Sequence, residues 1–455
     1  MGLSAIILAA GQGTRMRSDL PKVLQSIAGQ PLLGHVLDCA AALGAADTCV
    51  VYGHGADTVR ATFPDTAVRW VLQAEQLGTG HAVQQAMPDT PEGNRVLVLF
   101  GDVPLLTPGT CRRLVDDTPA GDVAVLTVDL DDPKGYGRII RDGGNVSRIV
   151  EQKDATAEEQ AVCEINTGVL VCPADKLREW LDNLSNDNAQ GEYYLTDVIG
   201  MAVAEGVTVH GVKAENWTEV MGINDKKQLA EAERALQARL VDELMKEGVG
   251  FADPARVDIR GTLKCGKDVF VDVNAVFEGD VELGDGVKIE SNNLVRDSRL
   301  GAGTVLHSNC HVEGATTGPN CEIGPFSRLR PGAELASNVK VGNFVEIKKS
   351  TVAEGSKVNH LTYIGDAEVG ENVNVGAGTI TCNYDGANKH KTTIGDGAFI
   401  GSGVELVAPV NVGARSTVGA GATVTRDVGE DELVIERSRQ KAVPGWKRPV
   451  KKETK

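Results

Sequence analysis

The sequence predicts three successive parts: an α/β domain with a mostly parallel sheet, a long connecting helix, and a triangular parallel β-solenoid. Three observations lead to this prediction. Short runs of Val, Ile and Leu alternate with helix-like stretches over residues 1–224, residues 225–247 contain neither glycine nor proline, and an aliphatic residue recurs every six positions after about residue 251.

The first part is predicted from four apolar runs that are separated by helix-like segments. These runs are Ala5–Leu8, Thr48–Tyr52, Arg95–Phe100 and Val123–Val128. Strands that are apolar throughout, rather than alternating, belong to parallel sheets that helices cover on both faces. We therefore expect residues 1–224 to form one such domain.

The second part is a helix expected over residues 225–248. Its larger apolar residues recur with helical spacing, at Leu229, Leu236, Leu240 and Leu244. A segment of this length makes about six turns. Gly248 supplies the residue type that most often follows a helix end.

The third part, residues 249–435, is predicted from its six-residue period. Aliphatic residues stand six positions apart in three runs: Leu283, Ile289, Val295; Ile323, Leu329, Leu335, Val341, Ile347; and Ile394, Ile400, Leu406, Val412, Val418, Val424. This step fits neither a helix face nor an alternating strand. It suits a three-sided solenoid in which each side buries one aliphatic residue and each corner needs a small or conformationally permissive residue.

Composition agrees with this interior. The 455 residues include 53 glycines, and only 4% are aromatic, so the core must be built from Val, Ile, Leu and Ala. The period fails between Val375 and Ile394, and insertions in a solenoid become loops, often on the binding face. The basic residues of the expected tail, 436–455, indicate a solvated end.

Charge and cysteine content exclude several classes of function. Lys and Arg total 46 against 63 Asp and Glu, and the net charge of −17 argues against binding to nucleic acid or to an anionic membrane. No run approaches the length of about 20 apolar residues needed for a membrane span, and the first residues lack a secretory pattern. Nine scattered cysteines fit reduced thiols, so we expect a cytoplasmic protein.

A glycine-rich turn follows the first predicted strand. Gly11 and Gly13 can present backbone N–H groups to phosphate, although an ordinary tight turn would look the same. Arg15 and Lys22 favour phosphate binding because two cations there can offset charge on a triphosphate; the alternative is two solvated surface charges. Asp102 follows Gly101 at the carboxyl end of another apolar strand, where it could hold Mg²⁺.

These segments resemble a known enzyme family. LAAGQGTRM, PKVL and GDVPL are similar to motifs of the sugar-1-phosphate nucleotidyltransferases. Residues 70–81, 135–139, 164–168 and 191–197 resemble more closely the bacterial bifunctional N-acetylglucosamine-1-phosphate uridyltransferases/glucosamine-1-phosphate acetyltransferases, over essentially the whole chain. The resemblance implies a Rossmann-like nucleotide-binding domain, followed by a left-handed parallel β-helix of hexapeptide repeats.

For the first domain, the resemblance implies a uridyltransferase site in which a sugar-phosphate oxygen attacks the α-phosphorus of UTP. Its nucleotide and sugar contacts would be Leu8, Ala9, Ala10, Gly11, Lys22, Gln73, Gly78, Thr79, Phe100, Gly101, Asp102, Gly137, Glu151, Asn166 and Asn224. Asp102 and Asn224 would ligate Mg²⁺. Arg15 and Lys22 would stabilise charge, since phosphoryl transfer depends mainly on positioning and neutralisation. Phe100 stands where the family often has Tyr, so a hydroxyl contact would be lost.

For the solenoid, stacked coils place residues about 18 apart above one another at about 4.8 Å. Arg330 and Lys348 are so spaced, and Asn374 follows His360 by almost one coil, so the cations and the imidazole could share a face. An exposed ladder of charges would give the same pattern. The resemblance implies that His360 is the general base, that Arg330 and Lys348 neutralise the sugar phosphate, and that Glu346 orients His360.

The remaining implied contacts belong to the sugar and the cofactor substrate. Tyr363 and Asn374 would fix the sugar ring, and the acetyl-CoA site would be lined by Ala377, Asn383, Tyr384, Ser402, Ala420 and Arg437. Because hexapeptide acyltransferases commonly act as trimers with sites between solenoids, the resemblance also implies a homotrimer with some contacts crossing subunits.

Two further motifs give little evidence of a function. His307 and His311 would need a helix to share a face, and the local period is six, so a zinc site is not favoured. Cys382 has no dedicated partner, so direct transfer from acetyl-CoA is favoured over a thioester intermediate.

We therefore expect an enzyme that N-acetylates glucosamine 1-phosphate with acetyl-CoA and couples the N-acetylglucosamine 1-phosphate formed to UTP, releasing pyrophosphate. The product would feed peptidoglycan and lipopolysaccharide synthesis, and hence cell shape. The alternatives are a single-activity nucleotidyltransferase with a structural β-helix and a non-catalytic scaffold. The scaffold would be expected to lack Arg15, Lys22 or Asp102, and all three are present.

Overall fold

A computed structural model describes residues 2–53, 55–437 and 439–449. The chain divides into two compact units, residues 1–239 and 240–455. The division falls inside one helix, between Arg239 and Leu240, whereas the sequence places the boundaries at the two ends of that helix.

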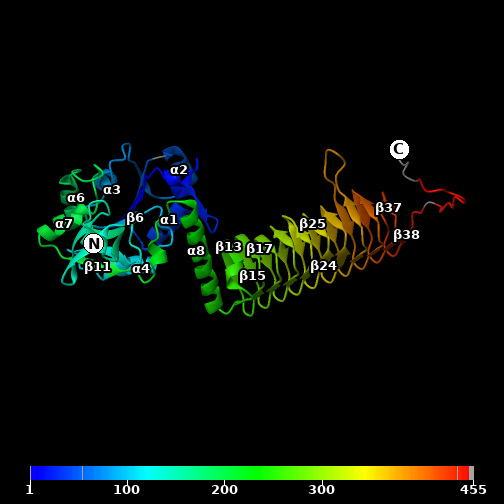
Figure 1. The fold of residues 1–455 in the computed structure, drawn as a ribbon. Coiled ribbons are helices and arrows are strands. Elements are labelled where there is room, and N and C mark those ends of the chain that lie inside the picture. Colours follow the sequence, from blue (N-terminus) through cyan, green and yellow to red (C-terminus); the bar gives the residue numbers. More distant parts are fainter. Residues whose placement is uncertain (1, 54, 438, 450–455) are drawn as a thin grey trace, which may run out of the picture. The chain divides into compact units, whose positions relative to one another are not determined.

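The first unit is built on a nine-stranded sheet (Figure 1). Seven strands follow one another in the order β11 (Val209–Lys213), β7 (Val123–Asp129), β10 (Glu164–Pro173), β6 (Arg95–Phe100), β1 (Leu3–Ala9), β4 (Asp47–Tyr52) and β5 (Arg69–Leu72), and the hairpin β8 (Arg138–Asp142) and β9 (Asn145–Val150) pairs with β10. β1 pairs in parallel with β4 and β6, while β10 runs antiparallel to β6 and β7. The predicted mostly parallel sheet is confirmed, with the antiparallel strand β10 and the antiparallel β8–β9 hairpin as exceptions.

Helices cover both faces of this sheet, and this explains the continuous apolar strands. The helices of this unit are α1 (Leu32–Ala42), α2 (Ala56–Thr62), α3 (Thr79–Ala86), α4 (Pro108–Asp116), α5 (Ala157–Gln160), α6 (Ala174–Asp182) and α7 (Asp197–Ala204). Ile7 and Leu99 are buried with residues of α1 and α4, whereas Ile6 and Val98 are buried with residues of α3, α6 and α7. A small hairpin of β2 (Ser26–Ile27) and β3 (Gln30–Pro31) precedes α1.

The helix that contains the division is α8 (Lys226–Lys246). The Asp225 carboxylate accepts hydrogen bonds from the backbone N–H groups of Lys227 and Gln228, both at 2.9 Å, and so caps its first turn. Val241 and Leu244, near its other end, are buried with the solenoid core.

The second unit is a parallel β-helix with three strands per coil. One side consists of β12 (Gly250–Phe251), β14 (Phe270–Val271), β16 (Lys288–Ile289), β18 (Val305–Leu306), β21 (Glu322–Ile323), β24 (Lys340–Asn343), β27 (Lys357–His360), β30 (Asn374–Val375), β33 (Phe399–Ile400), β36 (Thr417–Val418) and β38 (Leu433–Val434).

The other two sides share one larger sheet. It begins with the long strands β13 (Val257–Cys265), β15 (Ala275–Leu283) and β17 (Leu294–Leu300), from which two columns of strands continue. The first column is β19 (His311–Glu313), β22 (Arg328–Leu329), β25 (Glu346–Lys348), β28 (Tyr363–Gly365), β31 (Ile380–Cys382), β34 (Glu405–Val407) and β37 (Thr423–Val424). The second is β20 (Thr316–Thr317), β23 (Ala333–Leu335), β26 (Ser350–Val352), β29 (Ala367–Val369), β32 (Thr392–Ile394) and β35 (Val410–Val412).

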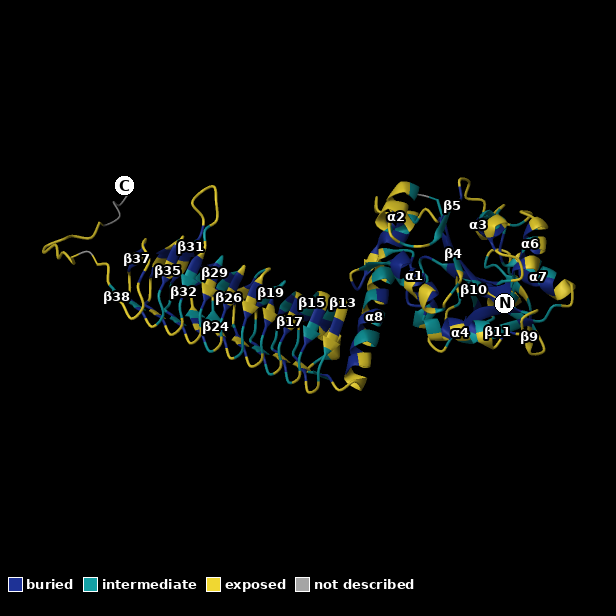
Figure 2. Ribbon diagram, turned by 180° about the vertical axis from the view of Figure 1, so that it is seen from behind, coloured by how far each residue is buried: buried dark blue, intermediate teal, exposed yellow. Residues whose placement is uncertain are grey.

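The six-residue period marks the inside of this helix. Every aliphatic residue of the three runs is buried, none more than 5% exposed. Figure 2 shows the burial along the strands and the exposure at the corners. Phe277 is the aromatic residue of the buried cluster, so the scarcity of aromatic side chains follows from the narrow interior.

The coil length is close to constant. Arg328 pairs with Glu346, and Glu346 pairs with Tyr363, so the second of these coils is one position shorter than the first. Glu368 pairs with Thr393, a much wider separation, because the chain makes an excursion between β31 and β32 (Figure 1, orange). Within the predicted interval from Val375 to Ile394, β31 continues the stack, so the predicted loop is confirmed only between Cys382 and Thr392.

The tail has no regular structure where it is described. Residues 439–449 contain no helix or strand, and the predicted basic end at 450–455 lies outside the described residues. Within the described residues, no helix is both long enough and apolar enough to cross a bilayer.

Two candidate active sites

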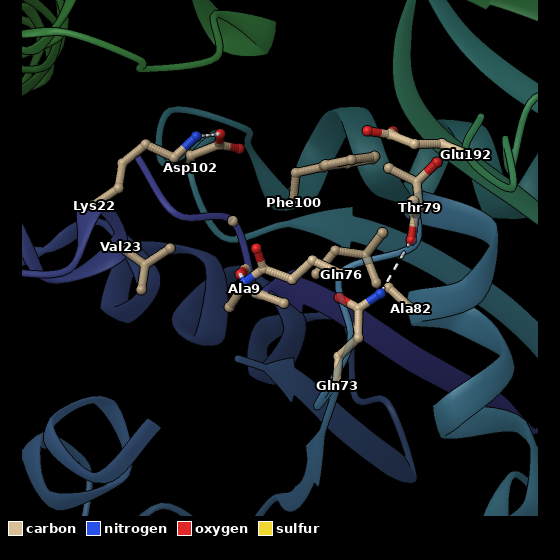
Figure 3. Close-up of a pocket in the computed structure, with 14 residues that line it drawn as sticks. Ala9, Lys22, Val23, Gln73, Gln76, Thr79, Ala82, Phe100, Asp102 and Glu192 are labelled. Carbon is tan, nitrogen blue, oxygen red and sulfur yellow. Dashed lines mark hydrogen bonds and ion pairs between the residues drawn. The ribbon is translucent and has the colours of Figure 1, made fainter. Parts of the chain in front are cut away.

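The first site is a pocket at the carboxyl ends of β1 and β6 (Figure 3). Ten residues expected at the nucleotide line it together: Leu8, Ala9, Ala10, Gly11, Lys22, Gln73, Gly78, Thr79, Phe100 and Asp102. Four more, which were not assigned from the sequence, also line it: Val23, Gln76, Ala82 and Glu192. Gln76 and Glu192 lie inside the quoted motifs, which was the available signal.

Two glutamines join the loops that form this pocket. The buried Gln73 donates from Nε2 to the Gly78 carbonyl at 3.1 Å, and Gln76 donates from Nε2 to the Ala10 carbonyl at 2.6 Å. The β5–α3 loop is thereby tied both to the start of α3 and to the glycine-rich turn after β1. These two hydrogen bonds connect the walls of the pocket.

A cation and two oxygen donors meet at one edge of the pocket. The Lys22 ammonium contacts the Asp102 carboxylate and lies 3.3 Å from Oδ1 of Asn224. The backbone N–H of Ile223 donates to the Asp102 carbonyl at 2.9 Å, which holds the Asn224 segment against the end of β6. The two predicted metal ligands are therefore brought together from positions far apart in the chain.

This donor set fits Mg²⁺. Mg²⁺ takes oxygen ligands, usually one or two from protein with waters and substrate phosphates completing the shell. A carboxylate and an amide oxygen supply such ligands, and an ammonium already lies between them. No group of three or more His, Cys, Asp or Glu residues suited to a metal occurs within 2–53, 55–437 or 439–449.

Gly13 has no side chain, and this leaves room for the side chain of Lys22. Its φ of +61° is in the left-handed region, and a Cβ there would lie 2.6 Å from Cβ of Lys22. The side chain of any other residue here would collide with the lysine stem and force it to shift. Arg15, the other predicted cation, lies exposed on the short 3₁₀ turn Thr14–Met16 and is not among the pocket-lining residues.

The three residues expected at the sugar also come together. The Asn166 N–H donates to the Gly137 carbonyl at 2.8 Å, and a Cβ on Gly137 would lie 3.4 Å from both carboxylate oxygens of Glu151. Thr196 donates to Glu151 at 3.1 Å. Burial raises the pKa of Glu151, an effect that the Thr196 hydrogen bond partly opposes.

Phe100 connects the residues expected at the sugar with those expected to bind the metal. A Cβ on Gly168 would lie 2.5 Å from its ring, so the ring packs directly on the β10 backbone near Asn166. Gly101, buried, and Asp102 follow it at the end of β6.

The second site lies along one corner of the β-helix. Residues in successive coils there adopt the left-handed conformation, and we call them the corner column: Asn292, Asn309, Phe326, Phe344, Leu361, Gly378, Gly403 and Gly421. Backbone hydrogen bonds fix the stacking, for example from Phe344 N–H to the Phe326 carbonyl and from Gly378 N–H to the His360 carbonyl, both at 3.2 Å.

The residues that precede the last four members form a second stack, which we call the His360 column: His360, Ala377, Ser402 and Ala420. Gly403 N–H donates to the Ala377 carbonyl at 2.7 Å and Gly421 N–H donates to the Ser402 carbonyl at 2.9 Å, so these residues occupy successive coils. The predicted base and three predicted acetyl-CoA residues thus lie in one line. Arg437 lies near the end of this column: its Nη2 is 3.8 Å from a Cβ placed on Gly419, the residue before Ala420.

Asn343, and not Glu346, orients the imidazole of His360. Nδ1 of His360 lies 2.8 Å from Oδ1 of Asn343, its neighbour in the coil before. Glu346 instead accepts from Arg330 Nη1 at 2.8 Å. The expectation for Glu346 was wrong because the strand register stacks residue 343, rather than residue 346, on residue 360. With the amide oxygen accepting, Nδ1 carries the proton and Nε2 is the basic nitrogen.

Cations gather on the adjoining side. Lys348 follows Arg330 by one coil, and Lys389 approaches it from the excursion. The Lys389 ammonium, with smaller contributions from burial and Arg330, lowers the pKa of Lys348. Lys389 was not assigned from the sequence, although the basic stretch NKHK in the insertion was visible.

The other predicted residues divide between two sides. Asn383 donates to Asp366 at 2.5 Å and lies 3.5 Å from the Tyr363 hydroxyl, which places the start of the excursion beside Tyr363. Tyr384 is exposed, with its hydroxyl donating to the Gly386 carbonyl at 2.6 Å. Asn374 pairs with Lys357, which lies three positions before His360 in the same strand, β27, so Asn374 and His360 share one side of the β-helix without being stacked.

Comparisons with known proteins find relatives for each unit and for the whole chain. A MobA-like NTP transferase domain matches residues 5–191, and bacterial transferase hexapeptide repeats match residues 391–426. Proteins named "Bifunctional protein GlmU" are similar over nearly their whole length: 58% identity in Aromatoleum aromaticum, 56% in Marinobacter nauticus and 53% in Acinetobacter baumannii, each alignment covering 99% of both chains. The chain therefore belongs to the GlmU family of bifunctional proteins.

Proposed function

We propose that the chain is a bifunctional enzyme of UDP-N-acetylglucosamine synthesis. It transfers an acetyl group from acetyl-CoA to glucosamine 1-phosphate, and then transfers a uridylyl group from UTP to the N-acetylglucosamine 1-phosphate, releasing pyrophosphate. One observation carries this proposal: each unit holds its own polar groups, the pocket around Lys22 and Asp102 in the first and the hydrogen-bonded pairs His360–Asn343 and Arg330–Glu346 in the second.

In uridylyl transfer, residues of the chain position the substrates and neutralise the charge of the phosphates. Gln73, Gly78 and Thr79 line the nucleotide end of the pocket, and Gly137, Glu151 and Asn166 hold the sugar. Lys22 and Arg15 offset charge on the phosphates. Mg²⁺, held by Asp102 and Asn224, supplies further neutralisation of the triphosphate when bound. The sugar-phosphate oxygen then attacks the α-phosphorus as the bond to pyrophosphate breaks.

In acetyl transfer, His360 takes part in the chemistry and the rest of its column lines the acetyl-CoA. The 2-amino nitrogen attacks the thioester carbonyl, Nε2 of His360 accepts the amine proton, and the bond to the CoA sulfur breaks. The proton is then available to the departing thiolate. Arg330 and Lys348 hold the sugar phosphate, Tyr363 and Asn374 hold the ring, and acetyl-CoA lies along Ala377, Asn383, Tyr384, Ser402, Ala420 and Arg437.

We further propose a homotrimer with the acetyl-transfer sites between solenoids. Three members of the corner column are large apolar residues in the solvent: Phe326, Phe344 and Leu361 are 51%, 55% and 64% exposed, and the two phenyl rings stack at 5.4 Å. Bulky side chains rarely adopt positive φ. In the proposed trimer, a second copy of the chain would cover these side chains next to His360, and their burial would offset the conformational cost of the positive φ angles.

Domain limits and location complete the proposal. We assign residues 1–224 to uridylyl transfer, 225–248 to the linker helix, 249–435 to acetyl transfer and 436–455 to the tail. A cytoplasmic location is supported by nine free cysteines, which suit a reducing compartment.

The test gives the purified protein acetyl-CoA, glucosamine 1-phosphate, UTP and Mg²⁺, and follows CoA and pyrophosphate separately. His360→Ala should abolish CoA release and leave pyrophosphate release from N-acetylglucosamine 1-phosphate intact. Asp102→Ala should do the reverse, so each variant is the control for the other. Equal loss of both activities in either variant would refute the two-site assignment.

The alternative, a single-activity nucleotidyltransferase with a structural β-helix, makes the opposite prediction for the solenoid. It expects pyrophosphate release without CoA release in the unaltered protein. If the alternative holds, His360→Ala changes neither CoA release nor pyrophosphate release.

A further inference from the structure

The cation site between Asp102 and Asn224 is already occupied by a side chain. The Lys22 ammonium touches the Asp102 carboxylate and lies 3.3 Å from the Asn224 amide oxygen. Its side chain is 11% exposed and that of Asp102 is 20% exposed. An ammonium that contacts both oxygens fills the place that an oxygen-seeking cation would take.

The two oxygens are held by the fold. Asp102 follows the end of β6, and its carbonyl accepts from Ile223 N–H at 2.9 Å. The next residue, Asn224, donates from its backbone N–H to Oε1 of Gln228 at 2.8 Å, on the capped first turn of α8. Neither donor has to move to meet a cation.

Lys22, by contrast, can leave. Its backbone is fixed in the 3₁₀ turn Lys22–Leu24 and its stem lies against Gly13, but its charge sits on a flexible four-carbon chain. A divalent ion entering between the two oxygens would meet the ammonium at contact distance. Repulsion at that distance in a partly buried site far exceeds thermal energy.

We propose that Lys22 acts as the resident cation of this site in the free enzyme: it excludes free divalent ions, and it moves to the nucleotide's phosphates when the metal enters with them. This role rests on the proposed function, because phosphate is what draws the ammonium away. Lys22 thereby keeps free divalent ions out of the metal site and later places its positive charge on the triphosphate.

The test uses Mn²⁺ alone, with no nucleotide, and measures free Mn²⁺ by electron paramagnetic resonance with the full-length protein. Lys22→Met should bind Mn²⁺ with a dissociation constant at least about tenfold lower than that of the unaltered protein. Lys22→Arg keeps the charge and should bind as weakly as the unaltered protein. Lys22→Gln is the second neutral variant, should Lys22→Met fail to fold.

Two controls isolate the site. Arg15→Met removes the same charge from an exposed position on the same loop, and its dissociation constant should stay within about twofold of the unaltered value. Adding Asp102→Asn to Lys22→Met should abolish the gain. The proposal is overturned if the neutral Lys22 variants bind Mn²⁺ no more tightly than Arg15→Met, or if the gain survives Asp102→Asn.

The two hypotheses fail separately. Pyrophosphate release by the unaltered protein together with unchanged Mn²⁺ affinity in the Lys22 variants would refute the resident cation and leave uridylyl transfer standing. Tighter Mn²⁺ binding without pyrophosphate release would refute the proposed function and leave Lys22 as the occupant of the site.

Discussion

Glu151, one of the residues proposed to hold the sugar, is partly buried, and its neighbours have opposing effects on its pKa. Burial raises its pKa, the nearby charges of Asp154 and Asp197 add to the rise, and the hydrogen bond from Thr196 lowers it. The group therefore takes up a proton at a higher pH than an exposed glutamate does. If the ionised form holds the sugar, activity is lost as the pH falls through this raised pKa.

This gives a prediction for Thr196→Val. Removing the hydroxyl removes the contribution that lowers the Glu151 pKa, so the acid limb of uridylyl transfer should move to higher pH. The measurement is kcat/KM for N-acetylglucosamine 1-phosphate against pH. The acetyl-transfer profile of the same variant serves as control and should be unchanged; an acid limb that stays put or moves to lower pH would contradict the assignment.

Asn343 offers a second residue-scale prediction. Asn343→Ala removes the group that holds Nδ1 of His360, so the ring can rotate and change tautomer. CoA release should fall at least about tenfold, since a misplaced base loses much of its contribution. Pyrophosphate release reports on folding of the other unit and should not change. Full acetyl-transfer activity would show that His360 needs no such partner.

At the scale of elements, the glycine-rich turn after β1 can be tested at Gly13. Gly13→Ala places a methyl group 2.6 Å from Cβ of Lys22 and also strains a φ of +61°. Displacing a catalytic group by about 1 Å can cost a hundredfold, so pyrophosphate release should fall by about that factor.

Gly44→Ala is the matched control for this prediction. Gly44 has a φ of +70° and open space around its Cβ position, so it carries the same backbone strain without the contact. Both variants should lose similar thermal stability, and Gly44→Ala should keep its activity. Equal losses of activity would assign the effect to strain rather than to Lys22.

Elements were also what the sequence predicted best. The six-residue period is a local signal, because each coil side buries one residue irrespective of the rest, and it predicted every buried aliphatic of the three runs. The apolar strands predicted the sheet in the same way. The antiparallel direction of β10 left no such signal, since its stretch Val169–Cys172 is as apolar and as buried as a parallel strand.

Partnerships across long separations were predictable only through the family resemblance. Lys22 and Asn224 are 202 positions apart, and no spacing rule connects them. The partner of His360 was missed for a different reason. Glu346 precedes His360 by 14 positions, whereas the register pairs His360 with Asn343, 17 positions before it, and the exact length of a coil depends on how its corners are made.

At the scale of the whole molecule, the exposed part of the corner column predicts an assembly. Phe344→Asp should break an interface made by Phe326, Phe344 and Leu361, because a charge would be buried there without a partner. Light scattering after size-exclusion chromatography should show loss of the trimer. CoA release should fall with it, while pyrophosphate release should persist.

Phe270→Asp is the control for assembly. Phe270 is also exposed, at 43%, but belongs to β14 on a side strand rather than to the corner column. This variant should remain a trimer with both activities. If Phe344→Asp remains a trimer as well, the corner column is not the interface.

The near-constant coil length restricts how this chain can change in length. Lys357 stacks on Asn374 and Phe399 on Thr417 at almost the same separation, whereas Asn374 and Phe399, which stack across the excursion, are much further apart in sequence. Deleting a single six-residue repeat would advance every later position by one side and carry Ala377, Ser402 and Ala420 away from His360. Deleting a whole coil would keep all sides in phase. Insertions and deletions that preserve the site should therefore come in whole coils, or be confined to the excursion, where extra residues leave the stack unchanged.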